Sequence, residues 1–86
     1  MPVAFILIKT EPAHIDDVVK SLVDMEVLSE MHSLAGDYDL IIKVRVDEFD
    51  QLARLVVDKI QRLKYLRETK TLIAFDAYNV PKPHKI

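Results

Sequence analysis

Apolar residues run without interruption from Val3 to Ile8, and most of them favour strands. Such a run is typical of a strand that is covered on both faces. Pro12 follows, and proline is tolerated in the first turn of a helix but not in its interior. The residues after it predict a helix with one apolar stripe, made of Ile15, Val18, Val19, Leu22 and Val23.

Two further strands are predicted over Val27–Ala35 and Tyr38–Val46, on either side of the only glycine, Gly36. If Gly36 and Asp37 form a two-residue turn, every residue of one strand faces a defined residue of the other. One face of this hairpin is then mostly apolar, with the pairs Ala35–Tyr38, Ser33–Leu40, Met31–Ile42, Ser29–Val44 and Val27–Val46. The opposite face includes one pair of opposite charges and consists of Leu34–Asp39, His32–Ile41, Glu30–Lys43 and Leu28–Arg45.

A second helix is predicted to begin after Asp47, because aspartate is a favourable N-cap residue. It extends to about Leu63, with an apolar stripe of Phe49, Leu52, Ala53, Val56, Ile60 and Leu63. A fourth strand is predicted over Leu66–Phe75. Residues 1–75 are therefore expected to form one domain, and residues 76–86, with two prolines and no periodicity, an extended C-terminal tail.

The predicted order β-α-β-β-α-β indicates an α+β, ferredoxin-like fold. Right-handed crossovers place both helices on one face of a four-stranded antiparallel sheet, with the first and third strands in the centre. The uncovered face would then carry Leu28, Leu34, Ile41 and one side of the first strand. This apolar area is too large to leave in water, so we expect a homodimer that packs sheet against sheet.

The composition of the chain excludes several classes of function but does not indicate a particular one. The chain has 86 residues, half of them apolar, and a formal net charge of -2 with both signs dispersed. Strong attraction to nucleic acid or to an anionic membrane is therefore not expected. The chain has no cysteine, and its start carries no basic leader or spanning segment, so a cytoplasmic location is expected. The three histidines lack the spacing of metal ligands, and neither a metal nor a cofactor is predicted.

The tetrapeptide Gly36-Asp37-Tyr38-Asp39 has two interpretations. Glycine and aspartate suit a hairpin turn, which needs no further function. Alternatively, two carboxylates and a phenol at a hairpin tip offer partners to an ammonium group and to a small polar ligand, especially if a neighbouring subunit closes the site.

The order of elements, the run Ala35-Gly36-Asp37-Tyr38-Asp39 followed by aliphatic strand residues, and Thr69-Lys70-Thr71 in the closing strand resemble the effector-binding domain of the Lrp/AsnC regulators. The resemblance covers about Val3 to Phe75. It implies a domain that dimerises through its sheets, assembles further into octamer or decamer rings, and binds amino acids or related small molecules between dimers.

The same resemblance assigns ligand-binding residues. Gly36, Asp37, Tyr38 and Asp39 would form the loop side of the site, and Thr69 and Thr71 would contribute from the closing strand. The family often has a hydroxyl residue where this chain has Ala35, which puts the identity of the ligand in doubt. The chain begins at the first strand of the sensing domain, so we expect a stand-alone form without a DNA-binding domain that partners a full-length regulator rather than DNA.

Two other functions stay open. A dimeric ferredoxin-like enzyme, such as a small monooxygenase or isomerase, would use His32 or His14 as its acid–base group, although no nucleophile, base and orienting group converge in the sequence. A purely structural assembly protein would need no ligand. RNA recognition is disfavoured because the central strands offer only Phe5 and Tyr38 for stacking. An amino-acid-binding ACT domain is disfavoured because Lys9-Thr10-Glu11-Pro12 stands where its ligand glycine usually lies.

Overall fold

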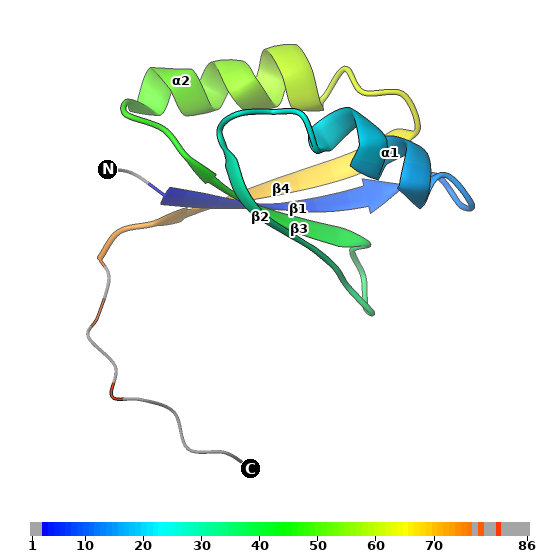
Figure 1. The fold of residues 1–86 in the computed structure, drawn as a ribbon, viewed down its shortest axis with the longest axis horizontal. Coiled ribbons are helices and arrows are strands. Elements are labelled where there is room, and N and C mark those ends of the chain that lie inside the picture. The colour runs from blue at the N-terminus through cyan, green and yellow to red at the C-terminus, as the bar shows by residue number, and fades with distance from the viewer. Residues whose placement is uncertain (1–2, 77, 79–80, 82–86) are drawn as a thin grey trace.

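A computed structural model describes residues 3–76, 78 and 81 as a four-stranded antiparallel sheet with both helices on one face (Figure 1). The strands stand in the order β2-β3-β1-β4, which confirms the first and third strands as the central pair. Most of the expected tail, residues 76–86, lies outside the described residues. In chain order the elements are β1 (Val3–Thr10), α1 (Ile15–Leu22), β2 (Leu28–Ser33), β3 (Leu40–Arg45), α2 (Phe49–Arg54), the π-helix η1 (Leu55–Ile60) and β4 (Leu66–Ala74).

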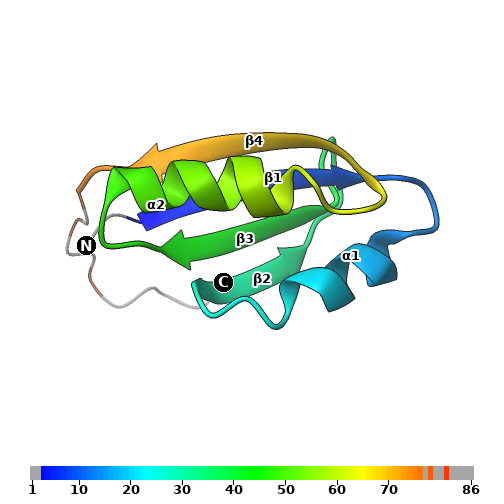
Figure 2. The same ribbon diagram turned by 90° about the horizontal axis from the view of Figure 1, so that it is seen from above.

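The core lies between the helices and the inner face of the sheet. The view from above shows α2 lying over β1, and α1 on the β2 side of the sheet (Figure 2). Alternate residues of β1 and β3 point into this layer because side chains of a strand alternate between the two faces. The described part of the chain contains no helix with the length and apolar character needed to cross a membrane. The buried apolar residues are Ala4, Ile6, Ile8, Val18, Leu22, Leu40, Ile42, Val44, Val46, Leu52, Leu55 and Ile60.

The register of the hairpin is confirmed at its centre, where Ser33 pairs with Leu40, Met31 with Ile42, and Glu30 with Lys43. The predicted register is wrong at the start of β2. A bulge at Ser29 places Leu28 opposite Val44 rather than Arg45, and the Ser29 hydroxyl donates to the carbonyl of Lys43 (3.3 Å). Leu28 consequently packs against the core and not on the uncovered face.

The prediction of a two-residue turn at Gly36 and Asp37 is also wrong. β2 ends at Ser33 and β3 begins at Leu40, so residues 34–39 form a wider connection. The backbone amide of Asp39 donates to the carbonyl of Ile8 (2.9 Å) on the neighbouring strand β1, and the amide of Leu34 donates to the carbonyl of Asp39 (2.8 Å). Because the end of β1 engages Asp39, the connection opens beyond a tight turn.

The second helix begins one residue later than expected. Its N-cap is Glu48, and the side-chain oxygen of Gln51 accepts hydrogen bonds from the amides of Asp47 and Glu48 (2.8 and 3.3 Å). Glu48 rather than Asp47 is therefore the N-cap, because Glu48 and Gln51 form a capping box in which the side chain of each accepts from the backbone amide of the other. The predicted stripe is correct at Leu52 and Ile60 but not at Phe49 and Ala53, which are exposed, and it omits Leu55, which is buried. In the first helix, Val23 is likewise exposed, because that helix ends at Leu22.

Candidate functional site

The connection at residues 34–39 lies beside the ends of the two central strands, and Asp39 ties it there. One oxygen of the Asp39 carboxylate accepts hydrogen bonds from the amide of Thr10 (2.8 Å) and from its hydroxyl (3.2 Å). Thr10 is the only polar side chain among the described residues that is buried. The Asp39 carboxylate therefore satisfies groups that would otherwise lie unpaired in the core, and its role in the chain is first of all structural.

Tyr38 points across the sheet to the outermost strand. Its hydroxyl donates a hydrogen bond to the Glu68 carboxylate (2.8 Å), and Glu68 is the cross-strand neighbour of Lys9 on β1. Because β1 lies between β3 and β4, the phenol ring must pass over the Lys9 end of β1 to reach Glu68. This hydrogen bond raises the pKa of Tyr38, and burial and the charges of Glu68 and Asp37 raise this pKa further.

Asp37 is exposed in the same connection, next to Tyr38. Gly36 has a backbone φ of +156°, and a Cβ atom added there would meet nothing within 4 Å. Glycine is therefore needed at this position for its backbone conformation, since a side chain would have room there. Together, Asp37, Tyr38, Glu68 and Lys9 place two carboxylates, a phenol and an ammonium group at one end of the sheet.

The structure does not bring the two threonines to this group. Thr69 pairs with Ile8 and Thr71 with Ile6, and both isoleucines are fully buried beneath the helices. Cross-strand partners share a face of the sheet, so the threonines lie on the helix-covered side. Tyr38 and Glu68 lie on the opposite side. Of the six residues predicted to bind ligand, Gly36, Asp37, Tyr38 and Asp39 are together, whereas Thr69 and Thr71 lie on the other face of the sheet from the Tyr38–Glu68 pair.

Glu68 and Lys9 are the polar residues that sequence reasoning missed here. The alternation of the fourth strand already places Glu68 and Thr69 on opposite faces. This alternation does not predict where the Tyr38 side chain points, because Tyr38 lies in the irregular connection between β2 and β3. The pairing of the first and fourth strands, which sets Lys9 beside Glu68, is likewise a long-range contact.

The uncovered face of the sheet continues from this site. It carries half-buried Phe5 and Leu7 from β1 and Ile41 from β3, together with Leu72 of β4, which is 44% exposed and lies opposite Phe5. Leu34, expected on this face, falls in the connection after β2. Charged groups surround the apolar centre, and one of them, Lys43, forms an ion pair with Glu30 (3.2 Å).

The two histidines considered as acid–base groups lie apart from this site. His14 precedes α1, stacks on the Tyr65 ring with the centroids 3.7 Å apart, and has its Nδ1 atom 3.0 Å from the Asp17 carboxylate. His32 lies on β2, and its Nε2 atom is 3.5 Å from Glu30. Within the described ranges, no cluster of three or more histidine or acidic side chains is arranged to hold a metal ion.

Known proteins resemble this chain in sequence. The sequence pattern of the Lrp/AsnC ligand binding domain matches residues 3–83. An HTH-type transcriptional regulator of Pyrococcus abyssi is 32% identical over 76 residues, which make up 85% of this chain and 51% of the regulator. The chain thus spans about half the length of this curated relative.

Solved structures have the same fold. TTHA0845 from Thermus thermophilus has a TM-score of 0.87 and 30% identity, over 93% of this chain and 100% of its own. The transcriptional regulator NMB0573 from Neisseria meningitidis, solved as a complex with L-Met, has a TM-score of 0.85 over 92% of this chain and 53% of its own. At 14% identity, that second likeness shows the fold alone. Since the family pattern runs over nearly the whole chain, the protein belongs to the Lrp/AsnC ligand binding domain family.

Proposed function

We propose that this domain senses a free α-amino acid at the end of the sheet where residues 36–39 meet Glu68. The observation that carries the proposal is the Tyr38–Glu68 hydrogen bond, which holds a phenol and a carboxylate beside the exposed carboxylate of Asp37. Family membership supports a ligand-binding role in transcriptional regulation, because relatives such as the Pyrococcus abyssi protein are HTH-type regulators.

The chemistry suits a zwitterion. Asp37 and Glu68 can accept hydrogen bonds from an ammonium group, and Lys9 and the Tyr38 hydroxyl can donate to a carboxylate. Gly36 and Asp39 hold the loop in place, the first through its backbone φ and the second through Thr10. Thr69 and Thr71, which lie on the other face, would take part only if ligand binding reached around the edge of β4.

We further propose that the domain works as a homodimer that assembles into rings of eight or ten subunits. The apolar centre of the uncovered face supports this, because Phe5, Leu7 and Ile41 are only half covered within one chain. Packing a second copy against this face would bring a partner surface next to Tyr38 and Glu68. A ligand bound there would shift assembly by its differential affinity for the assembled states.

Mixed assembly with a full-length regulator of the same family is the proposed route to transcriptional control. The chain matches about half the length of an HTH-type regulator, so an equivalent ligand-binding half is available in such a partner. In this proposal the domain acts through a partner's DNA-binding segment and makes no direct contact with nucleic acid.

Thermal unfolding with each of the twenty amino acids tests the ligand claim. L-Met is the first to try, since it is the ligand named for the Neisseria meningitidis protein. Ligand at about 100 times its Kd should stabilise the native state by roughly 2.7 kcal/mol. Tyr38→Phe and Asp37→Asn should reduce the shift in Tm, whereas Tyr78→Phe and Asp16→Asn, which change exposed residues elsewhere, should retain it.

The outcome is decided by the pattern across variants. If none of the twenty amino acids changes the Tm or the oligomer mass of the native protein, the sensing proposal is rejected. A shift that Tyr38→Phe and Asp37→Asn leave intact would keep the amino acid as ligand but reject this site.

A further inference from the structure

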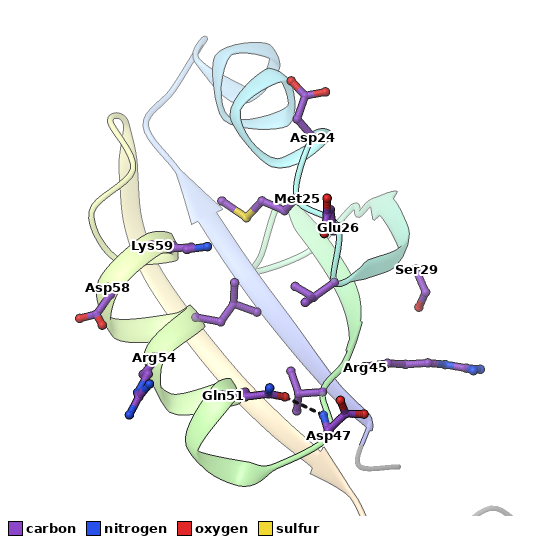
Figure 3. Close-up of a pocket in the computed structure, with 13 residues that line it drawn as sticks. Asp24, Met25, Glu26, Ser29, Arg45, Asp47, Gln51, Arg54, Asp58 and Lys59 are labelled. Carbon is purple, nitrogen blue, oxygen red and sulfur yellow. Dashed lines mark hydrogen bonds between the residues drawn. The ribbon is translucent and has the colours of Figure 1, made fainter.

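A groove of ≈ 1070 Å³ opens on the helix-covered side, at the end of the sheet opposite to residues 36–39. One wall is formed by α2 and η1, and the other by the connection from α1 to β2 (Figure 3). The end of β3 closes the groove, since Arg45 and Val46 are among its lining residues. β3 begins at Leu40, beside the site described above, and ends at Arg45, so the groove and that site lie at opposite ends of one strand.

The floor of the groove is apolar. Met25 and Val27 are partly buried and pack against the core, and Leu55 and Val46 belong to the core itself. These side chains give a ligand an aliphatic surface on which to rest, and covering that surface would remove it from water. The floor is adaptable as well, because the methionine side chain is flexible and polarisable.

Charged side chains line both walls. Lys59 extends from η1 across the groove toward Met25, whereas Arg54 and Asp58 point away from it (Figure 3). Asp24 and Glu26 belong to the facing wall. In the part of the chain that the structure describes, no ion pair joins Lys59 to either carboxylate. Asp24 projects away from the groove, whereas Glu26 lies beside Met25 (Figure 3). A cation and a carboxylate that line one groove without pairing across it are suited to a ligand that carries both charges.

The helical wall has an unusual backbone. Residues Leu55–Ile60 form a π-helix, in which the amide of Gln61 donates to the carbonyl of Val56 (2.8 Å). π-helical turns are rare and often occur at functional sites. The helix contains no glycine or proline from Phe49 to Leu63 that would account for the irregularity. The π-helix supplies both Leu55 and Lys59 to the groove.

We propose that this groove binds short peptides of two or three residues with free termini and aliphatic side chains. Lys59 receives the terminal carboxylate, Glu26 receives the terminal ammonium group, and the aliphatic side chains rest on Met25 and Leu55. The size of the groove favours a peptide over a single amino acid, since its volume of ≈ 1070 Å³ slightly exceeds the roughly 300–1,000 Å³ of small-molecule pockets. This second site does not depend on the site proposed at residues 36–39.

Two-dimensional amide NMR of the full chain titrated with dileucine tests the proposal. The expected result is saturable shifts at residues 25–27 and 54–59. Trileucine should act similarly. Dileucine blocked at both termini should bind about tenfold more weakly because the charge-assisted hydrogen bonds are lost. Free leucine should also bind about tenfold more weakly, because it is shorter and covers the apolar floor with one side chain fewer. Lys59→Met and Glu26→Gln should each weaken dileucine binding about tenfold, and the exposed controls Lys20→Met and Glu11→Gln should not.

Three results would overturn the proposal: no shift at the groove amides with dileucine at millimolar concentration, equal affinity for blocked and free peptide, or equal affinity for free leucine and dileucine. The comparison of blocked and free peptides uses the native chain, so it tests the proposal even if a variant fails to fold. Shifts at Asp37, Tyr38 and Glu68 caused by free amino acids report on the other site and leave this result unaffected.

Discussion

The hydroxyl of Tyr38 donates a hydrogen bond to the carboxylate of Glu68, 30 residues further along the chain (2.8 Å). This contact joins the irregular connection after β2 to the outermost strand β4, on the face of the sheet that no helix covers. It determines which polar groups meet at the candidate site, because it draws Tyr38 toward Glu68 and away from the threonines on the other side of the sheet.

Replacing Glu68 with glutamine should lower the pKa of Tyr38 toward its ordinary value. The carboxylate raises that pKa chiefly because it accepts a hydrogen bond from the protonated phenol. A raised folded-state pKa means that the stabilisation is present below the unfolded value of about 10 and is lost as pH rises through the folded pKa. NMR titration of the Tyr38 ring measures the shift. Glu26→Gln serves as control, and an unchanged Tyr38 pKa in Glu68→Gln would contradict the assignment.

Asp39→Ala should destabilise the domain by about 1–3 kcal/mol, because the amide and hydroxyl of Thr10 lose their acceptor in a buried position. Asp37→Ala is the matched control in the same connection, and its exposed side chain should change the free energy of unfolding by about 0.5 kcal/mol or less. Urea denaturation gives both values. Equal effects would show that the Asp39 carboxylate has no special structural role.

Phe5→Glu should prevent the proposed dimer from forming, because it places a charge in the apolar centre of the uncovered face. Phe49→Glu is the control, since Phe49 is 61% exposed on α2 and lies away from that face. Light scattering measures the masses, and circular dichroism establishes that both variants fold. A monomeric native protein at micromolar concentration would contradict the proposed dimer, as would a folded Phe5→Glu variant that remains dimeric.

Lys43→Met should raise the pKa of Glu30. The ammonium group of Lys43 holds this pKa below its ordinary value, first by a hydrogen bond, with His32 contributing a second one. Because the folded-state pKa is lowered, the stabilisation is present above the unfolded pKa of about 4.3 and is lost as pH falls through the folded value. NMR titration of the Glu30 carboxyl checks this. Lys20→Met, on the opposite face of the molecule, should leave the Glu30 pKa unchanged.

The sequence by itself determined the order of elements, the central strands and the middle of the hairpin register. These follow from local periodicity: the apolar run from Val3 to Ile8 indicates a central strand, although only one of its faces is fully covered within the chain, and pairing Met31 with Ile42 keeps apolar residues on one face. The Glu30–Lys43 pair followed from the same register. Each of these inferences required only knowledge of which residues lie on the same face of a strand.

Tertiary structure decided what local pattern does not encode. The turn widened because Asp39 bonds to Ile8 and Thr10 on another strand, and the bulge at Ser29 turned Leu28 into the core. The π-helix changed which residues of the second helix are buried. The candidate site depends on such contacts most of all. Residues 36–39 were found from their motif, but Glu68 joined them only because the sheet places β4 next to β1 and the Tyr38 ring reaches across it.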